Sequence, residues 1–232
     1  MNPAQPFSAL ASIPLSDIHN ASIEQTDTPG TRLMQDCIRV LRKGGLNLVG
    51  EVLKGQGTFY EMQHYPLTDV YDRDTHAQYY YHAHRGSDLE HGHFHLFMRK
   101  AGMPAGSQPE TSVFDSSTWP KDDDAIAHLI AVSMDKNGLP LGLFACNRWV
   151  TGETWYSADQ VIAMLDGFEI DHAYPSWPTN QWLTALVSVY RPQIETLLRH
   201  RDQVVSTWQK RFPDQNVLEN RELEITGYLP LP

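Results

Sequence analysis

The stretch Tyr79–Arg99 reads YYYHAHRGSDLEHGHFHLFMR and contains five of the protein's 11 histidines. Residues 79–85 and 91–99 alternate between polar and apolar side chains, as a strand with one buried face does. Gly86-Ser87-Asp88 lies between them and is typical of a turn. The sequence therefore predicts a β-hairpin whose loop covers residues 85–90.

The register of this hairpin decides where the histidines point. Side chains alternate between the two faces of a strand, and directly opposed side chains point the same way with Cβ atoms about 4.5–5.5 Å apart. The predicted pairs are His84 with His91, His82 with His93, and Tyr80 with His95. The opposite face then carries an ordinary core set: Tyr79, Tyr81, Ala83, Phe94, Leu96 and Met98. A shift of one residue would separate the two groups of histidines.

Imidazoles this dense on a rigid sheet favour a metal site, because neutral imidazole is the commonest metal ligand in proteins. The predicted ligands are His82, His84, His91 and His93. Glu90 would add an oxygen ligand or act as a general base, and His95 is expected beside the metal. The sequence therefore predicts a divalent transition metal as cofactor. Iron or zinc is expected first, and copper and manganese are also compatible.

Two other interpretations of the same histidines stay open. In the first, the histidines act in catalysis without a metal. In the second, they form a polar face that hydrogen-bonds to itself and to water. An HxH sequence alone has little specificity. Its pairing with HxHxH across a short loop favours the metal.

The segment Asn147–Trp155, NRWVTGETW, is a second candidate for function. Arg148 carries a planar fork that suits a carboxylate or a phosphate, so it is predicted to anchor an anionic group of a small substrate. The alternative is an arginine that covers tryptophan at the end of a strand.

Composition excludes several classes of protein. The net charge is −10 and no basic stripe is present, which disfavours nucleic acid as a partner. No apolar run reaches the length of a membrane span. The two cysteines are too few for a disulfide framework, and the first thirty residues show no signal peptide. A cytoplasmic protein is expected, and its oligomeric state is left open.

The first part of the chain predicts an irregular arm over residues 1–27, followed by one domain over residues 28–232. Thr28-Pro29 is typical of a helix start, and Gly44-Gly45 of its end. A second short helix is expected over Leu46–Leu53. Proline and three acidic residues indicate a loop over Pro66–Asp74.

The middle of the chain predicts a second hairpin. Ile126–Met134 and Leu139–Val150 are the expected strands, joined by the Asn137-Gly138 turn. This turn places His128 opposite Asn147. If the polar face of this hairpin joins the histidines, His128 lines the site.

The C-terminal part predicts helices and one strand. Ser157 is expected to begin a helix, and a long helical pattern runs from Thr179 past Pro192, which either starts a second helix or kinks the first. Glu222–Tyr228 is the expected last strand. The loop before the long helix carries possible further ligands: Glu169, Asp171 and His172. The fold class is therefore α+β, an antiparallel sheet built from hairpins and flanked by N-terminal and C-terminal helices.

HGHFHLF, residues 91–97, resembles the histidine-triad motif, in which alternating histidines precede two apolar residues. In that family the middle histidine attacks a nucleotide phosphate. The resemblance implies His93 as the nucleophile, with His91 and His95 orienting it. Gly92 departs from the motif, which prefers an apolar residue there.

Two further resemblances concern the same region. HAH followed by Glu90 is similar to a cupin metal motif, although the glutamate comes one or two positions late. YHAHR at 81–85, EHGHFHLF at 90–97 and NRWVTGE at 147–153 together resemble a bacterial family of unknown function. This last resemblance spans most of the chain. It implies a single domain and carries no activity.

Three functional hypotheses follow from the sequence. The first is a metal-dependent enzyme, hydrolytic or oxidative, that acts on a small anionic substrate. The second is a nucleotidyl or phosphoryl hydrolase of the histidine-triad type with His93 as nucleophile. The third is a metal-binding protein without enzymatic activity.

Overall fold

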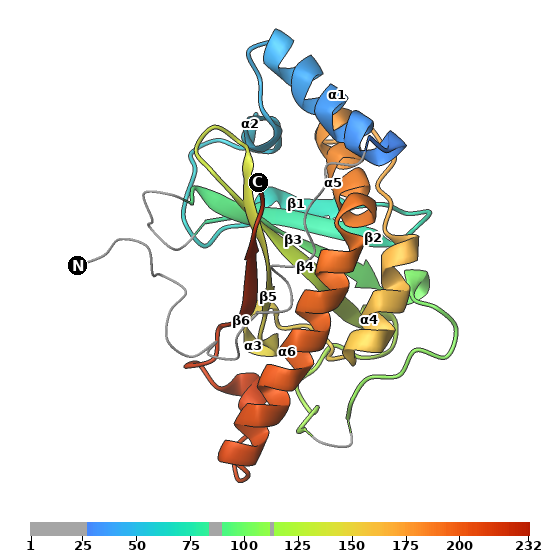
Figure 1. The fold of residues 1–232 in the computed structure, drawn as a ribbon, viewed down its shortest axis with the longest axis vertical. Coiled ribbons are helices and arrows are strands. Elements are labelled where there is room, and N and C mark those ends of the chain that lie inside the picture. The colour runs from blue at the N-terminus through green and yellow to red at the C-terminus, as the bar shows by residue number, and fades with distance from the viewer. Residues whose placement is uncertain (1–26, 84–89, 112–113) are drawn as a thin grey trace, which may run out of the picture.

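The computed structural model describes residues 27–83, 90–111 and 114–232, and at its centre is a six-stranded antiparallel sheet (Figure 1). Each strand pairs with the next strand of the chain, so the order in space is the order in sequence. The strands are β1 (Tyr65–Tyr71), β2 (Ala77–His82), β3 (Gly92–Arg99), β4 (Ile126–Met134), β5 (Pro140–Cys146) and β6 (Ile225–Pro230). The predicted α+β fold is therefore confirmed.

The described residues also form six α-helices. They are α1 (Pro29–Lys43), α2 (Leu48–Leu53), α3 (Arg148–Thr151), α4 (Ala158–Met164), α5 (Trp177–Val189) and α6 (Arg191–Arg211). Figure 1 shows α4, α5 and α6 along one side of the strands, and α1 packs on α5. Within the described ranges, none of the helices combines the length and the apolar character needed to cross a membrane.

Local sequence signals explain where the N-terminal helices begin. The Thr28 side chain accepts the Thr31 backbone N–H at 3.2 Å, and the Thr31 hydroxyl accepts that of Thr28 at 2.9 Å. This reciprocal cap, together with Pro29, starts α1 as predicted. The second helix begins at Leu48 rather than Leu46, because the Asn47 side chain accepts the Gly50 N–H and caps it there.

The C-terminal helices resolve the alternatives that the sequence left open at Pro192. The first helix ends at Val189, and Pro192 lies in the first turn of α6. Proline is tolerated in a first turn because the N–H that it lacks has no intrahelical partner there. Pro192 therefore starts a second helix instead of kinking a single long one.

The register of β2 and β3 is the predicted one. His82 lies opposite His93, and Tyr80 lies opposite His95. The predicted pair of His84 with His91 lies outside the described residues on the His84 side, as does most of the predicted loop over residues 85–90. The other face of these strands contributes to the main core beneath the helices: Tyr79, Tyr81, Phe94, Leu96 and Met98.

Strand β1 corrects the predicted loop over Pro66–Asp74. It pairs with β2, with an irregular register between Tyr65 and Val70, and Asp69 has a positive φ of 54°. The sequence predicted a loop here because Pro66 and Asp69 are residue types typical of turns. An edge strand tolerates both, because one side of it needs no ladder hydrogen bonds.

Asp72 joins the β1–β2 turn to the segment before α5. It is 5% exposed, its Oδ1 accepts the N–H groups of Asp74 and Thr75 at 2.8 and 3.1 Å, and its Oδ2 accepts that of Asp171 at 3.0 Å. Burial opposes ionisation, but these backbone hydrogen bonds together lower the pKa of Asp72 below its ordinary 3.8. The folded state therefore favours the charged carboxylate.

We expect Asp72→Ala to lower the free energy of unfolding by about 1–3 kcal/mol at neutral pH, because three partly buried backbone hydrogen bonds lose their charged acceptor. The native pKa is depressed, so this contribution is present above the ordinary carboxyl pKa and is lost as the pH falls through the native pKa. Urea denaturation of both proteins at neutral and acidic pH measures it. Asp74→Ala, at an exposed position of the same turn, is the control. Equal losses of unfolding free energy in Asp72→Ala and Asp74→Ala would contradict the stabilising role given to the Asp72 carboxylate.

Candidate metal centre

Five nitrogen and sulfur donors meet on the face of the sheet that is turned away from the main core. We call them the donor cluster: His82 of β2, His93 and His95 of β3, His128 of β4 and Cys146 of β5. They form two sets, His82–His93–His95 and His95–His128–Cys146. Within each set one donor atom per residue lies within 4.8 Å of the others. His93 and His95 are 0% exposed and His82 is 7% exposed, so the cluster is buried.

A β-bulge brings His128 into this cluster. Leu96 pairs with Ile130 and Phe97 with His128, so β4 has one extra residue between these pairs. Strict alternation from Ser133, which lies opposite His93, would turn His128 to the other face. The extra residue reverses the alternation, as bulges do. The hypothesis that His128 lines the histidine face therefore agrees with the structure.

The first donor set is oriented by a carboxylate. Glu90 Oε1 lies 2.5 Å from His93 Nδ1, and Glu90 Oε2 accepts the Ser133 hydroxyl at 2.8 Å. A carboxylate accepts, so His93 Nδ1 carries the hydrogen and its Nε2 presents a lone pair. That Nε2 lies 2.8 Å from His82 Nε2. A carboxylate behind a histidine fixes the ring orientation and the tautomer in many metal sites.

The second donor set is linked through His128. Its Nε2 lies 2.9 Å from His95 Nδ1, and its Nδ1 lies 3.7 Å from Cys146 Sγ. Burial lowers the pKa of His128 to about 3, and the charge of Arg201 acts in the same direction. The ring is therefore neutral at physiological pH, which is the form that binds metals.

A buried carboxylate supports the backbone behind this set. Glu153 Oε2 accepts the His128 backbone N–H at 2.5 Å. Burial raises the pKa of Glu153 to about 7, although Arg201, the His128 N–H and Arg148 favour the charged form. Arg201 thus acts on both His128 and Glu153, whereas Arg148 acts on Glu153.

Four of the predicted site residues come together. His82 and His93, predicted as ligands, belong to the first donor set, and His95 belongs to both. Glu90 contacts His93 directly. His84 is the predicted ligand that falls outside the described residues.

His91 does not join the cluster, and its predicted position is corrected. Its Nδ1 lies 2.6 Å from the Tyr81 hydroxyl, and its ring packs on Phe59 with centroids 5.5 Å apart. Tyr81 belongs to the main core, on the other side of the sheet. The strand begins only at Gly92, so the alternation that links His93 and His95 does not extend back to His91.

Arg148 lies away from the donor cluster in the short helix α3. The strand predicted over Leu139–Val150 ends at Cys146, because the Asn147 side chain caps α3 and also donates to the Val217 carbonyl. The Arg148 guanidinium pairs with Glu219 and lies 5.4 Å from the ring centroid of Trp119. This contact agrees with the alternative interpretation of Arg148, an arginine that covers a tryptophan ring. A role in binding substrate stays a prediction.

The acidic loop before α5 also lies elsewhere. The Asp171 N–H donates to Asp72 at the β1–β2 turn, and Asp171 Oδ1 accepts the indole N–H of Trp177 at 3.1 Å. The structure therefore does not bring Asp171 to the histidines.

Sequence reasoning passed over Cys146 and Ser133. A single cysteine or serine within an apolar strand is usually a core residue, so composition gave no signal. The signal that was available is position. Ser133 of β4 lies opposite His93. Cys146 comes two residues after Phe144, and the ring centroid of Phe144 lies 5.2 Å from that of His93.

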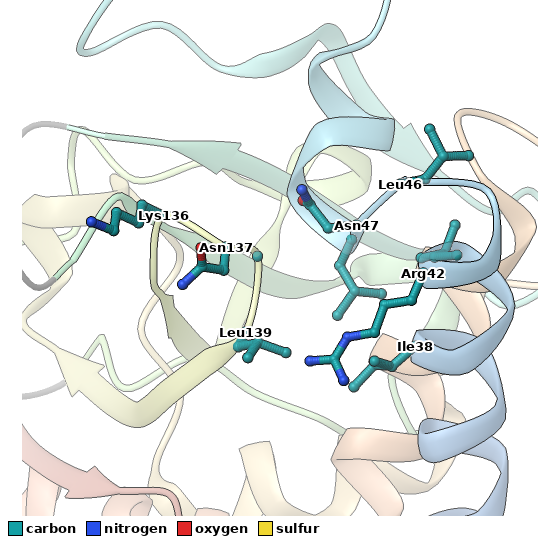
Figure 2. Close-up of a pocket in the computed structure, with 11 residues that line it drawn as sticks. Ile38, Arg42, Leu46, Asn47, Lys136, Asn137 and Leu139 are labelled. Carbon is teal, nitrogen blue, oxygen red and sulfur yellow. The ribbon is translucent and has the colours of Figure 1, made fainter.

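A separate cavity of about 320 Å³ lies between α1 and the β4–β5 turn (Figure 2). Arg42 points into it from α1, and Lys136 and Asn137 border it from the turn. Its lining contains none of the donor cluster. It is therefore distinct from the candidate metal centre.

Gly92 makes room for the close packing next to the cluster. A Cβ at this position would lie 2.5 Å from both the His82 carbonyl oxygen and the Tyr81 hydroxyl. We expect Gly92→Ala to lower the free energy of unfolding by about 1–3 kcal/mol. The new methyl group would press on the backbone oxygen of His82, which cannot move aside as the end of a flexible side chain can. Chemical denaturation measures the change.

Gly50→Ala, within α2, is the control for Gly92→Ala. Its Cβ would meet only ordinary contacts of 3.4 Å or more, and alanine is the better helix former. This variant is expected to be neutral or stabilising. A neutral Gly92→Ala variant would contradict the packing described here.

Comparison with known proteins places the chain in a family. No curated protein and no solved structure matches it. A family model described as a domain of unknown function, DUF6969, matches residues 30–231. Since this match covers most of the chain, the protein belongs to the DUF6969 family.

Proposed function

We propose that this protein is a metal-dependent enzyme that acts on a small anionic substrate, with one divalent transition metal held by His82, His93 and His95. The convergence of these three imidazoles, with His93 oriented by Glu90, is the observation that carries the proposal. Neutral imidazole is the commonest metal ligand in proteins, and three of them that converge on one point form a ready set of donors.

The spacing of the donors fits a metal of ordinary size. Nitrogen ligands of tetrahedral zinc lie about 2.0–2.1 Å from the ion, which separates two of them by roughly 3.3 Å. The Nε2 atoms of His82 and His93 are 2.8 Å apart. Small rotations of the two rings would therefore suffice. Iron and zinc are the first candidates, and copper and manganese are compatible with the same donors.

Three protein ligands are typical of catalytic rather than structural zinc sites, because the fourth position stays open. A metal at such a position polarises a substrate oxygen or lowers the pKa of a bound water molecule. In this chain Glu90 would hold the His93 ring in place and keep its hydrogen on Nδ1. Hydrolytic and oxidative chemistry are both compatible with this donor set.

A bound divalent metal would itself supply the positive charge that attracts an anionic substrate. The two arginines near the cluster are each paired with an acid, Arg148 with Glu219 and Arg201 with Asp202. Neither cysteine forms a disulfide, and both are buried, which supports a reducing, cytoplasmic location.

A metal-binding protein without catalysis is the second candidate. The complete burial of His93 and His95 favours it, because structural metal sites are closed. The two candidates differ in whether a small external ligand reaches the metal. Azide added to the cobalt-substituted protein tests this. A change in the visible cobalt spectrum supports the enzyme, and an unchanged spectrum supports the closed site.

We expect untagged protein to contain near-stoichiometric iron, zinc, copper or manganese, and a His82→Ala/His93→Ala double variant to lose the metal of this site. Elemental analysis measures both, and circular dichroism checks that the variant is folded. His76→Ala, outside the donor cluster, should keep its metal. Wild-type protein that contains no metal and takes up none from solution would overturn the proposal.

Glu90→Gln should weaken metal binding at this site by about 10- to 100-fold, because an oriented histidine loses its carboxylate partner. Competition with a chelator of known affinity measures the change. Glu222→Gln removes an exposed acid of the same type and should leave the affinity unchanged. An unaltered affinity in Glu90→Gln would show that Glu90 does not support the metal.

A further inference from the structure

The donor cluster contains a sulfur ligand that the three-histidine site does not use. Cys146 is the last residue of β5 and is 0% exposed. Its Sγ lies 3.7 Å from His128 Nδ1, and the other ring nitrogen of His128 lies 2.9 Å from His95 Nδ1. Two imidazoles and one thiol thus form a contiguous donor set across β3, β4 and β5.

One irregularity of the sheet brings this set together. The bulge in β4 turns His128 toward His95. Cys146 follows Phe144 by two residues on β5, so ordinary alternation places it on the same face of the sheet. Bulges commonly occur where a sheet redirects a side chain toward a functional site. The bulge is not needed for the His82–His93 pair.

We propose that His95, His128 and Cys146 form a second metal position that takes a thiophilic divalent ion, zinc or copper. The proposal rests on the proposed function through His95, which both positions share. A neutral imidazole has one lone pair and one N–H, so His95 binds an ion through each nitrogen only as an imidazolate, after its N–H proton is lost to solvent. Because His95 Nδ1 lies beside His128, we assign Nδ1 to this second position and Nε2 to the first.

The thiolate decides which metals fit. Cys146 loses its proton to solvent when it binds the ion, because a coordinating thiol is deprotonated. Thiolate with imidazole selects zinc or copper, and disfavours the oxygen-seeking ions magnesium, calcium and manganese. The second position is therefore more selective than a site made only of histidines, and it makes the centre binuclear.

Cobalt(II) is the probe for this position, because a cobalt–thiolate bond gives a sulfur-to-metal charge-transfer band in the near ultraviolet. Full-length protein loaded with cobalt should bind two ions per chain and show the band. Cys146→Ser should lose the band and one ion. Cys37→Ser removes the other buried cysteine, which lies in α1, and should keep both.

The His82→Ala/His93→Ala variant separates the two proposals. It should lose one cobalt ion and keep the sulfur band. Wild-type protein with one ion and no sulfur band would overturn the second position and leave the three-histidine site intact. Loss of all metal in the double variant would show that the second position does not exist independently, which also overturns it.

A measurement on the wild-type protein tests the second position without any variant, so it does not depend on whether a variant folds. X-ray absorption at the metal edge should show a sulfur neighbour at about 2.3 Å if zinc is bound at Cys146. A shell of nitrogen and oxygen alone would overturn the proposal. Copper(II) distinguishes the two candidate metals, because its thiolate complex has an intense visible band and zinc has none.

Discussion

The pairing of His82 with His93 across β2 and β3 is the constraint on which the candidate centre depends. It fixes which face of the sheet every neighbouring side chain occupies, because the period of a strand is two residues. Tyr81 and Phe94, one position along in each strand, then point into the core beneath the helices. Any slip in this register would bury imidazoles among apolar side chains, so the core holds the histidines in place.

Burial imposes a second condition on the same face. A polar group removed from water must find another partner, and the described side chains provide several. Ser133 donates to Glu90, Glu90 holds His93, and His93 meets His82. This hydrogen-bonded chain orders the rings before any ion is present. Side chains that are already ordered lose less conformational entropy on binding a metal ion than mobile ones do, and this raises the affinity.

Much of the fold could be predicted from the sequence, because its local signals are clear. The alternation in 91–99, the Asn137-Gly138 turn and the cap at Thr28 identified strands and helices that the structure contains. The edge strand β1 was missed because Pro66 and the positive φ of Asp69 are typical of turns. Within the candidate site, His82 and His93 follow from alternation alone. His91 and His128 do not, because a late strand start and a bulge changed their faces, and neither leaves a signal in composition.

The meander has a consequence for how the protein is made. All five donors come from residues 82–146, on four consecutive strands, so the ribosome completes them before α5 and α6 emerge. The apolar face of those strands, however, is covered by residues 177–211. A nascent sheet without this cover exposes its core and is only marginally stable. The donors are therefore synthesised early but are held in position late, so the donor cluster is complete only in the finished chain.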